Sequence, residues 1–171
     1  MEPAGKIGVL GTGTMGAGIV QLAAQSGHAV IACDSSVEAL ERAQVSVGEG
    51  LLRFAEKSVF TEEEASAHRD RVRWTTNTEE LRGSGVVIEA IVEKIGPKKG
   101  ALSALDALLP PEALLFTNTS SISITELAGI LQQIFARWKA GQTQDERFAT
   151  FGERARTLIL HAENLSRTGD V

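Results

Sequence analysis

The sequence predicts an α/β protein with a doubly wound, mostly parallel sheet, followed by a C-terminal α-helical hairpin. Two observations support this fold class. A glycine-rich turn at residues 11–16 joins an apolar strand to a helical run, and further apolar strands alternate with helical segments up to about residue 117. Such alternation is typical of a parallel sheet covered by helices on both faces. Beyond residue 129 this alternation ends, and apolar residues recur at helical spacing in two successive segments.

The glycine-rich turn is the most specific local signal. It lies between a β-rich run, Ile7 to Leu10, and a helical run, Met15 to Ser26. Gly11 would permit the tight turn, Gly13 the close approach of a pyrophosphate, and Gly16 close packing of the helix on the strand. The free N–H groups at the helix start would face the phosphates. The motif predicts a Rossmann-like nucleotide-binding unit; a glycine turn without a ligand is the alternative.

Asp34 indicates which nucleotide binds. It ends a second predicted strand, Ala29 to Cys33, at the distance from the glycines expected of a ribose-binding carboxylate. Such a carboxylate accepts hydrogen bonds from ribose hydroxyls and repels a 2′-phosphate, and no arginine stands beside it. NAD is therefore favoured over NADP. Alternatively, Asp34 caps the next helix, a role that Ser35 or Ser36 could fill instead.

The remaining elements follow from periodicity and turn chemistry. Apolar residues recur at helical spacing after Val37, and acidic residues follow Thr61 as in a first helical turn. Val86 to Val92 is a nearly unbroken apolar run, typical of a strand covered on both faces. Pro97 suits a first helical turn, and Pro110 with Pro111 ends that helix. We predict helices over 37–54, 61–70, 78–81 and 97–109, and strands over 72–75, 86–92 and 114–117.

Several polar groups and glycines fall at the carboxyl ends of the predicted strands. They are the 11–16 turn, Asp34, Glu93 and the segment Asn118-Thr119-Ser120-Ser121. Ligands of open parallel sheets bind outside these strand ends. The sequence therefore predicts one site along this edge.

Composition excludes several classes of function. The chain has 171 residues, a net charge of −5 and no basic cluster, which argues against nucleic acid as a partner. Its apolar runs are too short to span a bilayer and no signal pattern opens it, so we expect no membrane partner. The single Cys33 lies in a predicted strand and fits a reducing, cytoplasmic location. The three histidines lack metal-ligand spacing, so no metal site is expected.

Three segments carry a resemblance to a known family. They are Gly11-Thr12-Gly13-Thr14-Met15-Gly16, Ile88-Glu89-Ala90-Ile91-Val92-Glu93, and residues 117–125, TNTSSISIT. Together they resemble the 3-hydroxyacyl-CoA dehydrogenase family over about residues 5–130. The second and third segments are not general to dinucleotide-binding folds. The resemblance implies NAD as cofactor, an acyl-CoA substrate, and conversion of 3-hydroxyacyl-CoA to 3-oxoacyl-CoA in fatty acid metabolism.

The resemblance also implies residue roles. Catalytic positions near the nicotinamide and the substrate's 3-oxygen would be Ser120, Glu93 and Asn118. Lys98 would reach the nicotinamide ribose, and Lys57 would contact coenzyme A phosphates, whereas Gly50 replaces a serine that binds the same ligand in some members. The implied cofactor contacts are Gly11, Thr12, Gly13, Thr14, Met15, Gly16, Asp34, Ala90, Ile91, Glu93, Lys98 and Asn118. Alternatively, both lysines are ordinary solvated residues, Ser120 caps a helix starting near Ser123, and Asn118 is a turn residue.

The resemblance stops near Gly129. The family continues into a His-Phe-Phe-Asn-Pro motif, whose histidine is the general acid–base, and this pattern is absent from residues 130–171. His161 lies beside a predicted apolar stripe and is a poor substitute. We therefore expect absent or very weak turnover. The alternative to a dehydrogenase is a non-catalytic NAD-binding module with a helical self-association tail.

The predicted domains are a Rossmann-like NAD-binding domain over residues 1–128 and a helical tail over 129–171. Each tail helix has one apolar stripe that must be buried. A homodimer through a four-helix arrangement would bury both stripes. Packing of the hairpin onto the sheet of the same chain is the alternative.

Overall fold

The computed structural model describes residues 5–110 and 113–119. The chain divides into two units, Met1–Ile122 and Ser123–Val171, and all described residues belong to the first. Several predictions lie outside the described residues: the boundary at 128/129, the helical hairpin, the dimer, His161 and Ser120 with its capping alternative.

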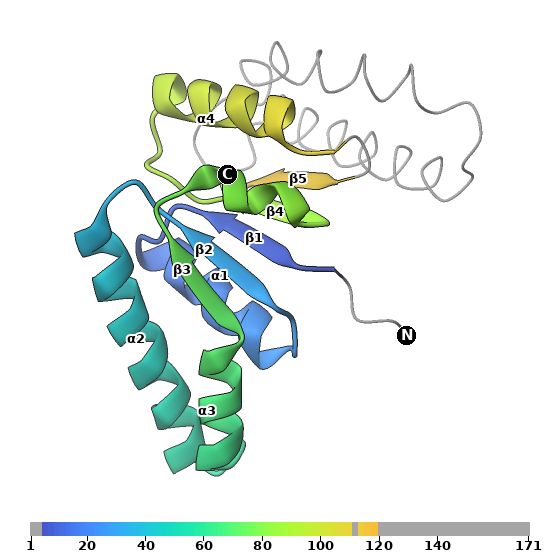
Figure 1. Cartoon of the computed structure of the whole chain (residues 1–171). Coiled ribbons are helices and arrows are strands. Elements are labelled where there is room, and N and C mark those ends of the chain that lie inside the picture. The colour runs from blue at the N-terminus through green and yellow to red at the C-terminus, as the bar shows by residue number, and fades with distance from the viewer. Residues whose placement is uncertain (1–4, 111–112, 120–171) are drawn as a thin grey trace, which may run out of the picture. The chain divides into compact units, whose positions relative to one another are not determined.

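The described unit is built on five parallel strands (Figure 1). Their order is β3-β2-β1-β4-β5, so the first strand of the chain lies at the centre. Every neighbouring pair is parallel, and Leu10 pairs with Cys33 on one side and Glu89 on the other. This confirms the predicted doubly wound sheet. The strands are β1 (Ile7–Leu10), β2 (Val30–Cys33), β3 (Val72–Thr75), β4 (Val86–Glu89) and β5 (Leu114–Thr117).

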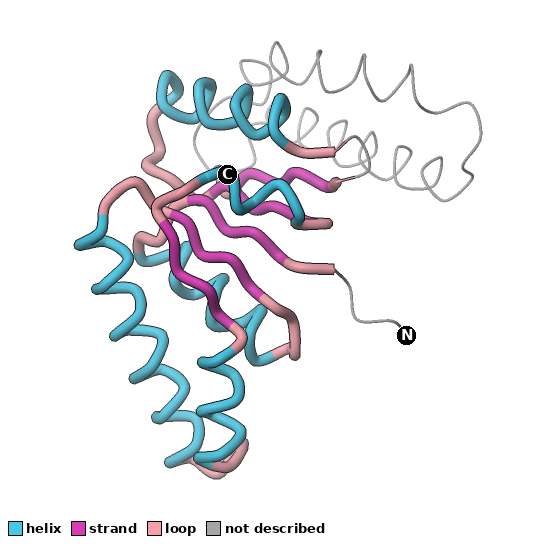
Figure 2. The backbone as a smooth tube through the Cα atoms, in the orientation of Figure 1, coloured by secondary structure: helices cyan, strands magenta, loops and turns pink. Residues whose placement is uncertain are grey.

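Helices cover the sheet on both faces (Figures 1 and 2). One face packs against α1, α2 and α3, and the other against the 3₁₀ helix η1 and α4. The helices are α1 (Thr14–Gln25), α2 (Val37–Glu56), α3 (Glu62–Asp70), η1 (Thr78–Gly83) and α4 (Ile95–Leu108). Each predicted helix and strand of this part of the chain is therefore present, with ends shifted by at most two residues except in β4.

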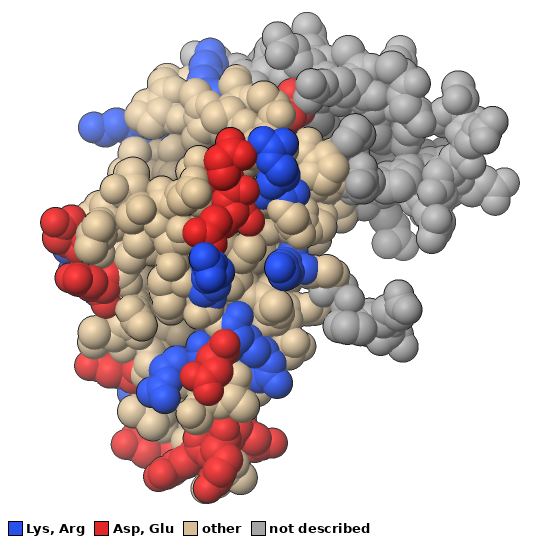
Figure 3. Space-filling model, in the orientation of Figure 1, with Lys and Arg blue, Asp and Glu red and all other residues tan. Residues whose placement is uncertain are grey.

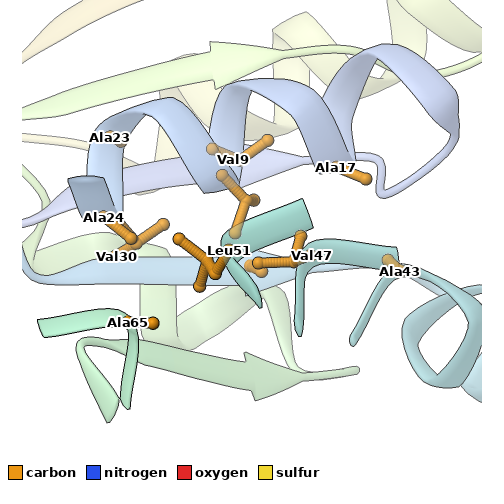
Figure 4. Close-up of a cluster of buried hydrophobic side chains, with 11 residues drawn as sticks. Val9, Ala17, Ala23, Ala24, Val30, Ala43, Val47, Leu51 and Ala65 are labelled. Atoms are coloured by element: carbon orange, nitrogen blue, oxygen red, sulfur yellow. The ribbon is translucent and has the colours of Figure 1, made fainter. Parts of the chain in front are cut away.

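The larger core cluster joins α1 and α2 to the sheet (Figure 4). Small side chains of α1, such as Ala17 and Ala24, let the helix lie close to β1 and β2, while Val47 and Leu51 fill the space from α2. Leu51 is 1% exposed. Burying a side chain of this kind contributes about 1.5–3 kcal/mol.

The second core cluster lies on the opposite face of the sheet. Ile31, Cys33 and Val87 come from strands, and Leu81, Leu105 and Leu108 from η1 and α4. Burial raises the pKa of the Cys33 thiol to about 11, with smaller contributions from the charges of Asp34 and Glu80. The neutral thiol therefore acts here as a small apolar core residue.

Strand β4 is shorter than predicted. The apolar run continues to Val92, yet the strand ends at Glu89. The Glu89 carboxylate accepts the N–H of Ile91 at 2.8 Å, which turns the chain out of the sheet. As a result Val92 is 62% exposed. In strand β5, Phe116 is 43% exposed.

Candidate functional site

Two glycines of the turn after β1 are required by the fold itself. Gly11 has a φ of +96°, which disfavours any residue with a side chain, and a Cβ there would lie 2.7 Å from the Ala90 carbonyl group. A Cβ on Gly16 would lie 1.9 Å from the carbonyl oxygen of Gly11. The tight turn and the close helix approach predicted from sequence are therefore both present.

Gly13 differs from these two glycines. Its φ is −62°, and a Cβ built on it meets no atom within 4 Å. It is the N-cap of α1, so no side chain caps the helix, and no acidic residue lies in the first turn. Amide groups at such a helix start favour an anion. The fold has room for a side chain at residue 13. A pyrophosphate bound against this backbone would occupy that room and would clash with such a side chain.

Asp34 is tied directly to this turn. Its Oδ2 atom accepts the Thr12 backbone N–H at 2.8 Å and the Thr12 hydroxyl at 3.2 Å, and its Oδ1 atom accepts the Ser36 N–H at 3.0 Å. The Ser36 hydroxyl caps α2 by accepting the Ala39 N–H at 3.1 Å. Ser36, and not Asp34, therefore caps α2, and Asp34 lies beside the glycine turn at the carboxyl end of β2. Its contact with a ribose stays a prediction.

A cavity of about 340 Å³ opens beside Asp34 and Gly11. Leu10 and Ile91 line it, together with small and apolar side chains of α4, among them Ala101 and Ala104. Polar residues after β3 complete it: Thr76, Thr78 and Glu79. Sequence reasoning missed these lining residues, because neither Thr76 nor the start of η1 carries a motif.

A second group of residues meets at the carboxyl ends of β4 and β5. Glu89, with no exposed surface, accepts hydrogen bonds from the Thr117 hydroxyl at 2.5 Å and from the Lys98 ammonium at 2.8 and 3.1 Å. Sequence reasoning missed Glu89. The available signal was a carboxylate inside an apolar strand, which must find a partner when buried.

Lys98 is buried at the start of α4. Its side chain has no exposed surface, so the alternative of an ordinary solvated lysine is wrong. Besides Glu89, its ammonium donates to the Asn118 carbonyl at 3.1 Å and lies 3.3 Å from Glu93 Oε2. An ammonium carries three N–H donors, and these protein oxygens occupy them. The contact with a nicotinamide ribose stays a prediction.

Glu93 and Asn118 lie close together at this end of the sheet. Glu93 accepts the Thr119 hydroxyl at 2.6 Å, and its side chain is 32% exposed. Asn118 donates its backbone N–H to the Glu89 carbonyl at 2.7 Å, which continues the pairing of β4 with β5. The structure therefore brings the predicted residues Glu93, Lys98 and Asn118 together, whereas Ser120 lies outside the described residues.

Lys57 lies far from this edge. It follows the last residue of α2, whose 20 residues extend about 30 Å from the Asp34 end. The exposed glutamates 62–64 begin the next helix, and acidic side chains gather where α2 meets α3 (bottom of Figure 3). Gly50 faces α1, where a Cβ would lie 2.2 Å from Gln21 Oε1. Contact between Lys57 and coenzyme A stays a prediction.

The described residues contain neither a metal cluster nor a membrane span. No group of three or more His, Cys, Asp or Glu side chains there could hold a metal ion. No helix in this part of the chain is long and apolar enough to cross a membrane.

Known proteins share this domain. The 3-hydroxybutyryl-CoA dehydrogenase of Escherichia coli K12 has a crystal structure that matches 73% of this chain and 26% of its own, with a TM-score of 0.69 and 39% identity. A second match is (S)-3-hydroxybutyryl-CoA dehydrogenase from Ralstonia eutropha, with a TM-score of 0.70 and 34% identity over 73% of this chain and 44% of that one.

Curated relatives give the same result. A 3-hydroxyadipyl-CoA dehydrogenase of Escherichia coli K12 is 40% identical over 122 residues, which are 71% of this chain and 26% of that protein. A probable 3-hydroxybutyryl-CoA dehydrogenase of Bacillus subtilis is 38% identical over 73% of this chain and 44% of its own length. The chain thus spans less than half the length of these relatives.

The family assignment rests on most of the sequence. Residues 6–135 match the family described as 3-hydroxyacyl-CoA dehydrogenase, NAD binding domain. This match includes the glycine turn, Asp34 and the Glu89–Asn118 region whose geometry is given above. The chain therefore belongs to the 3-hydroxyacyl-CoA dehydrogenase family and contains its NAD-binding domain, for which NAD is the cofactor.

Proposed function

We propose that NAD(H) binds along the carboxyl edge of the sheet. The pyrophosphate rests on residues 11–16, the adenosine ribose meets Asp34, and the adenine enters the cavity lined by α4 and by Thr76, Thr78 and Glu79. Because β2 and β4 lie on opposite sides of β1, the nicotinamide half extends towards Glu93 and Asn118. Dinucleotides cross such a sheet at the point where the strand order reverses.

Gly13 is the single observation that carries this proposal. The other two glycines of the turn have reasons within the fold, whereas Gly13 has neither a positive φ nor a close neighbour. Open glycines also occur within helices, as at Gly48, but Gly13 is the N-cap of α1, where free backbone amides favour an anion. Close approach of a phosphate to this backbone is the reason that we propose for a glycine here.

The corresponding variant is Gly13→Val. A valine there has space in the free protein, so we expect the unfolding temperature to stay close to that of the wild type. Its side chain would occupy the pyrophosphate position, so NADH affinity measured by calorimetry should fall below detection. Gly48→Val, at a helical glycine of α2 with equally open surroundings, is the matched control and should bind NADH normally. Normal NADH binding by Gly13→Val would overturn the proposal.

The substrate class follows from the family and its relatives. We propose 3-hydroxyacyl-CoA thioesters, oxidised to 3-oxoacyl-CoA with hydride transfer to NAD. Glu93 and Asn118, and Ser120 outside the described residues, are the residues that we propose to lie near the reacting atoms.

Turnover by this 171-residue chain is expected to be absent or very weak. No histidine in it is followed by Phe-Phe-Asn-Pro, and a positioned general acid–base contributes roughly 10²–10⁴-fold to such a reaction. The assay is loss of NADH absorbance with acetoacetyl-CoA. A turnover number near 10 s⁻¹, an ordinary enzyme value, would show that another base acts, and His161→Ala would then identify or exclude His161.

The second candidate function is a non-catalytic NAD-binding module whose tail mediates self-association. The absence of the histidine motif from residues 130–171 favours it. NADH binding without turnover of acetoacetyl-CoA supports the binding module, whereas turnover supports the dehydrogenase.

A further inference from the structure

Met15 is an exposed methionine within the glycine-rich turn. It is the second residue of α1, and 60% of its surface is exposed. The next residue, Gly16, lies against the Gly11 carbonyl group and close to Ala90, which fixes the backbone at this point. Met15 therefore presents its thioether to solvent from a rigid part of the fold.

A thioether in this position is open to oxidation by peroxides. Hydrogen peroxide transfers one oxygen atom to the sulfur, which becomes a sulfoxide, and the peroxide is reduced to water. The reaction converts a flexible apolar side chain into a polar one whose oxygen accepts hydrogen bonds. Because exposure decides which sulfur atoms react, Met15 is the first candidate among the described residues.

The cysteine on β2 is protected from the same reagent. Cys33 is fully buried, and burial raises the pKa of its thiol to about 11, with smaller contributions from Asp34 and Glu80. The reactive form of cysteine is the thiolate, so a buried neutral thiol reacts slowly. Peroxide therefore reaches Met15 before it oxidises Cys33.

The Met15 side chain belongs to the turn of α1 that favours an anion. The first hydrogen bond within the helix runs from the Ala17 N–H to the Gly13 carbonyl at 2.8 Å, so the amides of residues 14–16 precede it. Neither a capping side chain nor an acidic residue serves this turn. Side chains of a helix lean towards its N-terminus. A sulfoxide oxygen on Met15 would therefore compete with a phosphate for these amides.

We propose that Met15 is an oxidation site that regulates binding of NAD(H). Peroxide converts Met15 to its sulfoxide, whose oxygen accepts hydrogen bonds at the start of α1 and displaces the pyrophosphate. Bound cofactor covers the thioether and slows its oxidation, and reduction of the sulfoxide restores binding. This inference rests on the proposed seat of the pyrophosphate on residues 11–16.

Peptide mapping by mass spectrometry after limited treatment with hydrogen peroxide tests the site. We expect one added oxygen on the peptide that contains Met15 before any appears on the peptide that contains Cys33. Saturating NAD⁺ should slow the oxidation of Met15 several-fold. Oxidation of Cys33 before Met15, or an unchanged rate at Met15 in a chain saturated with NAD⁺, would overturn the inference.

Calorimetry before and after peroxide treatment tests the consequence. The Kd of NADH for the wild-type chain should rise at least about tenfold, and methionine sulfoxide reductases should return it to its original value. The unfolding temperature should stay the same, because the modified side chain is exposed. A weaker affinity accompanied by a fall in unfolding temperature would indicate a damaged fold and would contradict the inference.

Two variants separate the sulfur groups, each compared with itself before and after treatment. Met15→Leu has no thioether at this turn, so its Kd for NADH should not change with peroxide. Cys33→Ala keeps Met15 and should respond as the wild type does. A peroxide effect that persists in Met15→Leu, or an unchanged Kd in a wild-type chain fully oxidised at Met15, would overturn the inference. An untreated wild-type chain that binds no NADH would instead overturn the proposed function on which it rests.

Discussion

At the scale of single residues, the site combines groups that the fold needs with groups that it does not. Gly11 and Gly16 are fixed by backbone geometry, and Thr12 is 3% exposed and bound to Asp34. Gly13 is exposed to solvent, and neither its φ nor a close neighbour requires a glycine there. The spacing predicted the three glycine positions, because a group that comes close to the backbone excludes a side chain and so requires glycine.

The Glu89–Lys98 pair yields a stability prediction at this scale. Lys98→Met leaves the Glu89 carboxylate buried without its cation, which should cost about 3–5 kcal/mol of unfolding free energy. The double variant with Glu89→Gln should cost clearly less than Lys98→Met alone, because no unpaired charge remains buried. Urea denaturation of both proteins measures the difference. Equal or greater destabilisation in the double variant would contradict a coupled pair.

At the scale of elements, most of the described fold could be predicted from periodicity. The strands β1, β3 and β5 have the predicted bounds because turn residues flank each short apolar run. The end of β4 could not be predicted, since the apolar run continues beyond it and a hydrogen bond from Ile91 to Glu89 ends the strand. The burial of Lys98 could not be predicted either, because it depends on how α4 docks against β4 and β5.

Helix α3 offers an element-scale prediction. Thr61 and Glu64 form a capping box, in which the Thr61 hydroxyl accepts the Glu64 N–H at 3.1 Å and Glu64 accepts the Thr61 N–H at 2.8 Å. Thr61→Ala should therefore lower the unfolding free energy by about 0.5–2 kcal/mol. Ser46→Ala, at an exposed position within α2, should change it by less than about 0.5 kcal/mol. Equal effects of the two changes in thermal denaturation would exclude a contribution from the cap.

At the scale of the whole molecule, the sequence after residue 129 predicts self-association. Its second predicted helix carries an apolar stripe that includes Phe148, Phe151 and Leu158, and soluble monomers rarely expose a patch of that kind. We expect a homodimer by light scattering, and Phe151→Asp with Leu158→Asp should give monomers or aggregates. A wild-type mass of 18.2 kDa, that of one chain, at high micromolar concentration would contradict the dimer.

The most direct test of the whole account is the choice between NADH and NADPH by the wild-type chain. The Asp34 carboxylate lies against Thr12 at the glycine turn, where it would accept ribose hydroxyls and repel a 2′-phosphate. Parallel calorimetric titrations at one salt concentration should show NADH binding at least about tenfold more tightly, a difference of about 1.4 kcal/mol. Equal or tighter binding of NADPH would contradict the placement of the adenosine ribose at Asp34, and with it the proposed path of the cofactor along the sheet.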